Sequence, residues 1–312
     1  MGKKALVLGA IGQSIPDIDF VTSWWMPTAA DLLAHRGFTH SMLFAILVSV
    51  LLAWSSKKIW QTLTMKQWCF FWGIQLFMHL FLDIFNVYGT GLFEPFSHYR
   101  VSLNTFFVLD PLFSLWPVLA LPLLLASKKG SSRANKIATY PLMISGLYMA
   151  YSISNKLIIT SSVEHDLAGK HMPVKRFFTT PTPLNNLLWY IVAETDSGFY
   201  TGYSSLLDKS PDIKYRFVPQ NTQGQPQDND ELKRLKRFSQ GYYVFSQFGD
   251  TTVFNDLRFG EMTAGLQPDP RFCFYYYLSP QLSNDVIIQR GRFKGWNRDM
   301  VYRFIGRIKG VK

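Results

Sequence analysis

Four long apolar runs occupy the first half of the chain, and they constrain its fold more than any other feature. They are Phe38–Ser56, Gln67–Leu82, Pro111–Ser127 and Ile137–Asn155. Each approaches the roughly 17–25 residues that an α-helix needs to cross a bilayer. A fifth run, Ala5–Ile15, is shorter and fits a tilted span, a re-entrant segment or a signal-peptide core. The sequence therefore predicts an α-helical integral membrane domain with four to five spans.

Charged residues divide the chain into two unequal halves. Residues 1–155 hold 11 Lys/Arg and 6 Asp/Glu, whereas residues 156–312 hold 21 Lys/Arg and 15 Asp/Glu. We therefore predict a membrane-embedded helical domain at 1–155 and an extramembrane C-terminal domain at 156–312. The formal net charge of +11 is compatible with anionic lipid. No zinc-finger spacing or RNA-binding aromatic motif accompanies this charge, so nucleic acid is not an expected partner.

The C-terminal half has the pattern of a β-rich domain. Its aromatic and β-branched segments are short and are separated by turn residues, which is typical of antiparallel strands in a sheet or barrel. These segments read LLWYIVAE, GFYTGYSS, KYRFVP, GYYVFSQF, TTVFNDLRF and RFCFYYYL. Asn221–Asp230 is expected to be a polar loop. Glu231–Phe238 is a candidate basic helix, with either a solvated outer surface or one that docks on anionic headgroups.

The lysines orient the predicted spans. Positive charge gathers before the short first run, after the first long run and after the third, at Lys3, Lys4, Lys57, Lys58, Lys66, Lys128, Lys129, Arg133 and Lys136. Because cytoplasmic loops are enriched in Lys and Arg, we expect these segments to be cytoplasmic. The intervening segments and the C-terminal domain then face outward.

Acidic residues and histidines concentrate on the predicted outer side. All six acids of the first half lie there, together with four of the six histidines: Asp17, Asp19, Asp31, Asp83, Glu94, Asp110, His35, His40, His79 and His98. Ionisable groups at membrane depth are costly and commonly mark a functional site. We therefore expect one polar site at the outer ends of the helices.

Three local patterns in this set suit metal binding. His79 and Asp83 are four residues apart in a helical run, so both project from one side of a helix. Asp17 and Asp19 are two apart, and in an extended backbone their carboxylates point the same way. His35 and His40 flank Gly37, which permits a sharp bend. Taken singly, each pattern also fits ordinary hydrogen bonding, helix capping or interfacial placement.

Together these residues predict a divalent metal site. Mixed His and carboxylate ligands suit zinc first, with manganese and iron(II) as alternatives. Such a metal lowers the pKa of a bound water and favours hydrolysis of an ester or phosphoester. Arg36 could pair with a carboxylate or bind an anionic group such as phosphate. Asp110 is a candidate ligand, general base or helix N-cap.

In their order along the chain, SIPDIDF, HRGFTHS, HLFLDIFNVYGT, EPFS and LDPLF resemble the bacterial membrane-bound metal-dependent hydrolase family. TPTPLNNLLW resembles the C-terminal part of longer members, so the resemblance reaches about Leu207. Some members are inner-membrane proteins under LexA control in the DNA-damage response. The resemblance implies metal-site roles for Asp17, Asp19, His35, His40, His79 and Asp83. Arg36, Thr39, Asn86, Gly89, Thr90 and Asp110 match pattern positions whose roles are not implied. An early Thr-His common in the family has no counterpart before His35.

The expected function is therefore hydrolysis by metal-activated water in the bacterial inner membrane. The expected substrate is a lipid, another amphiphile or a small molecule that carries an ester or phosphoester. Asp17, Arg36 and Asp110 are the candidate catalytic residues. A second interpretation is a non-catalytic metal-binding scaffold or sensor, whose metal site would be closed to water. A transporter fits less well, because a large β domain follows only a few spans.

Overall fold

The structure is a computed structural model of the 312-residue chain. It describes residues 2–108, 110–128, 130–220, 228–266, 271–279 and 296–311. The chain divides into two compact units. The first comprises 1–103 and 112–148, and the second comprises 104–111 and 149–312. Most of the polar loop predicted at Asn221–Asp230 lies outside the described residues.

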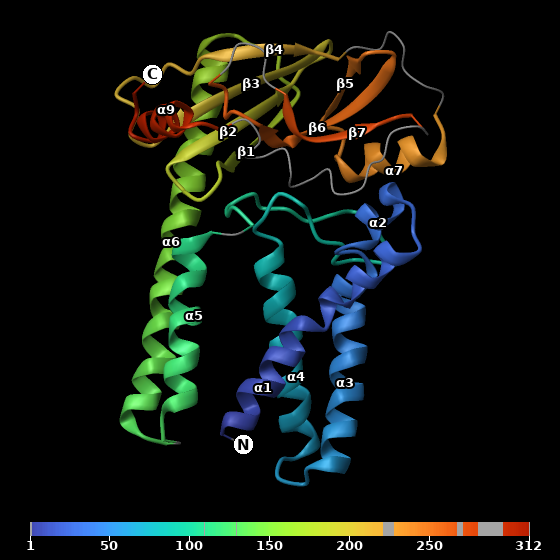
Figure 1. Cartoon of the computed structure of the whole chain (residues 1–312), viewed down its shortest axis with the longest axis vertical. Helices are drawn as coiled ribbons and strands as arrows, with labels where there is room; N and C mark the ends of the chain where they lie inside the picture. Colours follow the sequence, from blue (N-terminus) through green and yellow to red (C-terminus); the bar gives the residue numbers. More distant parts are fainter. Residues whose placement is uncertain are drawn as a thin grey trace. The chain divides into compact units, whose positions relative to one another are not determined.

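The first unit is helical. Its elements are α1 (Lys3–Ser14), η1 (Pro16–Trp24), α2 (Thr28–Ala34), η2 (Phe38–His40), α3 (Met42–Ile59), α4 (Met65–Asp83), α5 (Pro111–Ala126) and the first part of α6 (Ser132–Gly169). Here η denotes a 3₁₀-helix. Figure 1 shows α3 and α4 side by side, with the chain reversing between them. The N-terminus of α3 and the C-terminus of α4 therefore lie at the same end.

Local sequence explains where α3 and α4 begin. Ser41 is the N-cap of α3, and its hydroxyl accepts a hydrogen bond from the Phe44 amide at 3.0 Å. Thr64 and Gln67 form a reciprocal capping box at the start of α4. The two helices pack through small and aromatic residues, and Trp72 Nε1 donates to Ser56 Oγ at 2.9 Å. These contacts fix α3 against α4, the helix that carries His79 and Asp83.

Two helices, α3 and α6, are long and apolar enough to cross a membrane. The predicted four to five spans are not supported. The α1 helix has 12 residues, and α5 has 16 with Pro117 and Pro122 inside it, so both are short for a bilayer. The α4 helix is long enough, but Lys66, Gln67, Gln75 and other polar residues lower its mean hydropathy.

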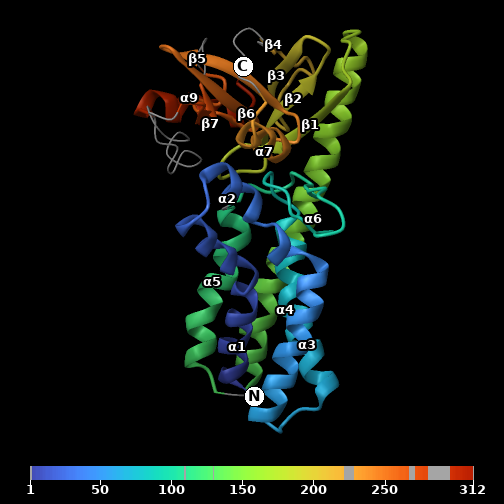
Figure 2. The same ribbon diagram turned by 90° about the vertical axis from the view of Figure 1, so that its right-hand side faces the viewer.

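The second unit contains two antiparallel sheets, which confirms the predicted β-rich C-terminal region. One has the order β1 (Arg176–Pro181), β2 (Leu188–Glu194), β3 (Gly198–Ser205) and β4 (Tyr215–Pro219). The other has the order β5 (Tyr243–Phe248), β6 (Thr251–Glu261) and β7 (Phe272–Tyr277). Figure 2 shows β1–β4 as neighbouring strands. The β1 strand was not predicted from the sequence.

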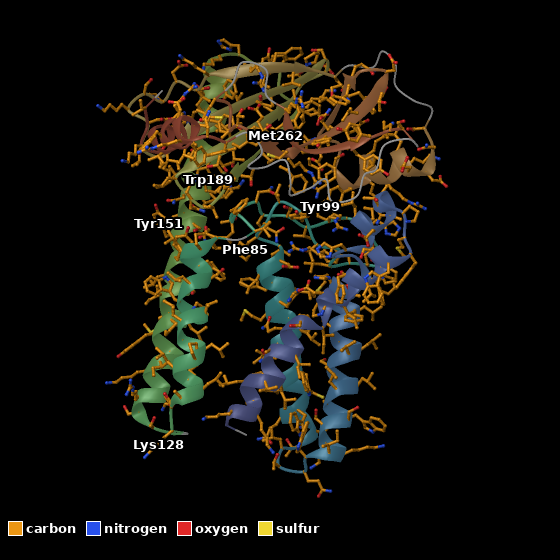
Figure 3. All side chains as sticks on the ribbon, in the orientation of Figure 1. Phe85, Tyr99, Lys128, Tyr151, Trp189 and Met262 are labelled. Atoms are coloured by element: carbon orange, nitrogen blue, oxygen red, sulfur yellow. The ribbon has the colours of Figure 1, made fainter. Side chains whose placement is uncertain are left out.

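The second part of α6 packs on the first sheet. Ile159, Val163 and Leu167 form a buried cluster with Trp189 and Ile191 of β2. Figure 3 labels Trp189 on this strand. Sequence alone predicted a span ending at Asn155, whereas the helix continues to Gly169 because its last turns supply core residues to the sheet.

The described part of the second unit also contains two short helices. The predicted basic helix is present as α7 (Asp230–Phe238), and α9 (Arg298–Ile308) follows the last described strand. The apolar residues of α7, Leu232, Leu235 and Phe238, are buried. The Phe238 ring packs at a tilt against Phe274 of β7, with ring centroids 5.5 Å apart. Its basic residues Lys233, Arg234 and Arg237 remain exposed.

Candidate metal centre

Three segments of the first unit bring four potential ligands together. The first segment is η1, which carries Asp17, and the second is η2, which carries His40 just before the N-cap of α3. The α4 helix ends at Asp83 and carries His79 one turn earlier. Because α3 and α4 are antiparallel neighbours, residues before α3 meet residues at the end of α4. The predicted convergence of these four residues is therefore seen in the fold.

The ligand atoms lie at short and similar separations. His40 Nε2 is 3.2 Å from His79 Nε2, 3.2 Å from Asp83 Oδ2 and 3.4 Å from Asp17 Oδ1. His79 Nε2 is 3.6 Å from Asp17 Oδ1 and from Asp83 Oδ2. Asp17, His40 and His79 have ligand atoms that all lie within 4.8 Å of one another. Three side chains thus direct a nitrogen or an oxygen toward one small volume, and Asp83 Oδ2 lies beside the two histidines.

Asp19 lies on the other side of the His40 ring. Its Oδ2 is 3.2 Å from His40 Nδ1, and it accepts hydrogen bonds from the Arg36 amide at 2.8 Å and from Thr39 Oγ1 at 2.9 Å. Its Oδ1 is 3.0 Å from His35 Nδ1. Asp19 therefore holds the Nδ1 edge of His40 and leaves Nε2 directed at the cluster. A carboxylate in this position orients a ligating histidine and makes it a stronger donor.

The segment between His35 and His40 is tightly bent. Arg36 has a φ of 56°, in the left-handed region that few non-glycine residues adopt. A Cβ at Gly37 would lie 2.9 Å from the carbonyl oxygens of both Leu33 and Ala34. Glycine is therefore required where the chain turns back on α2. This bend brings His35 and His40 to the same carboxylate, Asp19.

Arg100 braces this bend from a distant part of the chain, and sequence reasoning assigned it no role. The buried guanidinium donates from Nη1 to the Leu33 carbonyl at 3.1 Å. From Nη2 it donates to the carbonyls of His35 at 2.8 Å and Gly89 at 2.9 Å. The available signal was that Arg36 and Arg100 are the two cations of the predicted outer segments.

Arg36 itself lies beside Asp83. Its Nε is 3.3 Å from Asp83 Oδ2, and its guanidinium is 5.3 Å from the centre of the Tyr88 ring. Among the described residues, neither Arg36 Nε, Arg36 Nη1 nor Asp83 Oδ2 has a hydrogen-bond partner of good geometry, although all three atoms are buried. Buried polar atoms without partners are uncommon and point to a ligand or an ion.

The charged groups perturb one another strongly. Burial raises the pKa of the Asp17 carboxyl, but hydrogen bonds with His40 and His79 outweigh it and hold that pKa well below its usual range. Burial also raises the pKa of Asp19, and His35 and His40 reverse the effect and lower it. Burial lowers the pKa of His40, but Asp17, Asp19 and Asp83 raise it to about 10. A proton and a divalent cation therefore compete for this imidazole.

The donor set fits a zinc ion. Four ligands about 2.0–2.1 Å from zinc at tetrahedral angles lie roughly 3.3–3.4 Å apart. The five separations above, 3.2–3.6 Å, bracket that value. Asp17, His40 and His79 form the group whose ligand atoms all lie within 4.8 Å of one another, and Asp83 Oδ2 lies beside the two histidines outside that group. Asp83 Oδ2, which is buried without a hydrogen-bond partner of good geometry in the part of the chain that the structure describes, supplies a further reason to expect a cation. Asp17, His40, His79 and Asp83 are thus the residues that could hold it.

The other predicted site residues lie elsewhere. Asp19 contacts both His35 and His40 Nδ1, and the predicted role of Asp19 and His35 as direct ligands stays a prediction. Asp110 is buried and belongs to the second unit. Its predicted catalytic role also stays a prediction.

Comparison with known proteins gives one family and two relatives. A family model described as "YdjM inner membrane protein" matches residues 2–159, which is half of the chain. "Uncharacterized protein YfhP" of Bacillus subtilis (strain 168) is 26% identical over 205 residues, covering 65% of this chain and 60% of the relative. "Inner membrane protein YbcI" of Escherichia coli (strain K12) is 28% identical over 89 residues, covering 28% of this chain and 51% of the relative. The matches therefore span between half and three-fifths of these relatives. No solved structure matches the chain.

Proposed function

Because this chain belongs to the YdjM inner membrane protein family, we propose that it is an inner-membrane hydrolase with one divalent metal site. Asp17, His40, His79 and Asp83 would hold the cation, with zinc preferred. The substrate would be an ester or phosphoester, carried by a lipid or another amphiphile. The family name supports the inner-membrane location, and the donor geometry supports the metal.

One observation carries the proposal: two imidazole nitrogens, His40 Nε2 and His79 Nε2, lie 3.2 Å apart, and each is within 3.6 Å of two carboxylate oxygens. Two neutral imidazoles at this distance oppose their lone pairs unless a proton or a cation lies between them. A divalent cation also balances the negative charge of Asp17 and Asp83. When bound, it would lower the pKa of a coordinated water and supply a nucleophile near neutral pH.

The residues of the chain would divide the remaining work. Asp17 is the ligand open to solvent, since its side chain is 51% exposed while that of His40 is fully buried. Water and substrate would therefore approach from the Asp17 side. Arg36, with two buried donor atoms next to Asp83, would hold an anionic oxygen of the substrate and stabilise charge that develops during hydrolysis.

The first experiment is to measure metal in the detergent-purified full-length protein by plasma mass spectrometry. Wild type should carry about one equivalent of zinc, and His79→Ala and Asp83→Ala should lose it. The matched control is His98→Ala, because His98 is an exposed histidine of the same unit that pairs with Glu94 at 2.9 Å. Loss of metal in the control as well, or no metal in wild type after resupply, would overturn the proposal.

Catalysis is tested separately, by measuring ester hydrolysis. Metal-loaded wild type should hydrolyse members of a panel of phosphoesters and carboxylic esters, and Arg36→Lys should lower kcat/KM most for the negatively charged ones. Arg36→Lys should retain the metal, which separates substrate binding from ligand loss. Equal loss on neutral and anionic esters would remove the assigned role of Arg36.

A non-catalytic metal-binding scaffold or sensor is the second candidate, and one observation favours it. Four protein donors fill the coordination sphere of a tetrahedral structural zinc and leave no position for water. The exposure of Asp17 is the feature that argues for an open site. X-ray absorption of the zinc-loaded protein separates the two candidate functions. A water ligand at an open site adds an oxygen scatterer around the zinc, and this oxygen would remain in Asp17→Ala.

We further propose that the chain crosses the membrane more than once, with the site on the extracytoplasmic side. Lys57 and Lys58 lie in the last turn of α3, at the opposite end from His40. Because positively charged residues are retained in the cytoplasm, this polarity directs the candidate metal centre outward.

A further inference from the structure

The 3₁₀-helix η1 has an inverted distribution of polar and apolar side chains. Asp19 is 4% exposed, and Asp17 is directed at the two histidines of the candidate metal centre. Phe20, by contrast, is 60% exposed and Trp24 is 75% exposed. In a water-soluble helix the acids would face solvent and the aromatic residues would be buried. Here the outer surface of η1 is apolar.

The residues around η1 extend the same surface. We call the apolar rim the set of exposed large apolar residues at this end of the first unit, on η1, the turn after it, and η2 with the start of α3. Its members are Ile18, Phe20, Trp24, Trp25, Met26, Phe38 and Met42. Exposed apolar patches of this kind mark contact with a partner or a membrane.

The apolar rim leads into the exposed surface of α3. Along that helix Ile46, Leu47 and Val50 are exposed, and α3 is one of the two helices able to cross a bilayer. Met42 belongs to both surfaces. Lipid would cover the exposed surface of α3. The apolar rim continues that surface at the N-terminal end of α3, next to His40.

The segment after α4 adds aromatic residues to the same end. Gly91 donates its amide to the Arg36 carbonyl at 2.8 Å, and Met42 donates to the Leu92 carbonyl at 3.0 Å, so this segment is joined to the bend around Arg36. Phe93, Phe96 and Tyr99 of the segment are exposed. Figure 3 labels Tyr99 here, beyond Phe85 at the end of α4.

We propose that the apolar rim is seated in the headgroup region of the bilayer, and that the substrate enters the candidate metal centre from the leaflet rather than from bulk water. Tryptophan and phenylalanine in short amphipathic elements are the residues that insert at this depth. Residues 16–34 contain no Lys or Arg, so the seating is apolar and independent of anionic lipid.

Lateral entry rests on the proposed function and narrows its substrate class. An amphiphile that stays in the leaflet would keep its acyl chains along the apolar rim and α3. Its polar head would reach Asp17, the exposed ligand, with an anionic oxygen at Arg36. The substrate class is therefore a membrane lipid that carries a phosphate ester in its headgroup.

Seating is tested with the full-length chain in liposomes of phosphatidylcholine and phosphatidylglycerol, independently of activity. The double variant Trp24→Phe/Trp25→Phe lacks the tryptophan fluorescence of these two side chains. Subtracting its emission from that of wild type therefore gives the emission of Trp24 and Trp25. We expect acyl-brominated lipid to quench that emission at least about twofold more than aqueous acrylamide does, as at an interfacial site. Trp54→Phe is the control, since Trp54 is exposed on the spanning helix α3.

We expect bromolipid to quench Trp24 and Trp25 to the same extent as Trp54, with and without phosphatidylglycerol. Quenching by acrylamide and not by bromolipid, with Trp54 still quenched by bromolipid, would show that the rim lies in water and would overturn the inference.

Lateral entry is tested with Trp24→Ser/Trp25→Ser. This variant should lose about tenfold in hydrolysis of a long-chain phosphoester embedded in the liposome, and stay within about twofold of wild type on a water-soluble aryl phosphodiester. Equal rates on the embedded substrate would overturn lateral entry. If wild type hydrolyses neither compound, the proposed hydrolase function fails, and the quenching result still decides whether the rim is seated in the membrane.

Discussion

The Nε2 atoms of His40 and His79 lie 3.2 Å apart, although 39 positions separate the two residues along the chain. One precedes α3 and the other lies one turn before the end of α4, so the pair depends on the packing of these two helices. The ring centroids are 5.1 Å apart and the planes are tilted by 56°, which aims the two nitrogens at a common point rather than stacking the rings. The geometry of the site therefore depends on the contacts that hold each imidazole ring in place.

Asp19→Asn should weaken zinc binding without removing a ligand atom. The change keeps the size of the side chain but removes the negative charge of the carboxylate that contacts His40 Nδ1 and His35. We expect a loss of about 10–100-fold in zinc affinity, measured by competition with a chelator. Asp31→Asn is the matched control, since Asp31 accepts from Thr22 Oγ1 and does not contact the ligands. Unchanged affinity in Asp19→Asn would remove its orienting role.

Gly37→Ala should destabilise the first unit. The added methyl would lie 2.9 Å from two carbonyl oxygens, and relief requires a shift of the backbone that carries His35 and His40. We expect a loss of about 1–3 kcal/mol in the free energy of unfolding, measured by denaturant titration in detergent. Gly73→Ala, inside α4 with nothing within 4 Å of the new Cβ, should be neutral or stabilising by about 0.5 kcal/mol. Equal effects at the two glycines would contradict the packing argument.

The second unit should lose stability with rising pH through Glu261. Burial raises the pKa of the Glu261 carboxyl, and Arg216 and Thr201 only partly oppose it. The folded state therefore holds this proton more tightly than the unfolded state. The contribution is complete below the unfolded pKa, near 4.5, and is lost as the pH rises through the folded value.

Hydrogen exchange of the β6 amides checks this expectation. After correction for intrinsic exchange rates, the protection of these amides in wild type should fall relative to that in Glu261→Gln as the pH rises above about 4.5. A difference between the two proteins that stays constant with pH would show that Glu261 titrates alike in both states.

The proposed sidedness predicts which surface a membrane-impermeant maleimide reaches in intact cells. Ser97→Cys, in the exposed segment after α4, should be labelled in intact cells. Lys58→Cys, at the other end of α3, should be labelled only after lysis. Wild type is the background control, because Cys273 is buried and Cys69 is partly buried. The reverse labelling pattern would place the candidate site in the cytoplasm.

The sequence predicted the parts of the site that depend on local spacing. The four-residue interval of His79 and Asp83 put both on one side of a helix, and α4 bears this out. The glycine in HRG indicated a bend, and the structure has one. The strands β2 to β7 followed from short aromatic and β-branched segments separated by turn residues. Such features depend on a few neighbouring residues, so a short segment is enough to predict them.

Features that depend on packing between distant segments were not predictable. Arg100 acts on carbonyls 65 and 67 positions away, and nothing near it in the sequence indicates those partners. Asp19 resembles Asp17 in sequence context, yet the 3₁₀ geometry of η1 sends one to Nδ1 and the other to Nε2 of His40. The excess of predicted spans arose because apolar runs also form helices that are short for a bilayer, in α1 and α5, or lowered in mean hydropathy by polar residues, in α4.

The bend between His35 and His40 fixes the length of its segment as well as its residues. Two histidines five apart share neither a helical side nor a strand side, and they meet at Asp19 only because Arg36 is left-handed and Gly37 packs against α2. One residue gained or lost in the interval would rotate His40 away from His79. Any chain that builds this centre in the same way must therefore keep the interval at five, whatever else in the loop diverges.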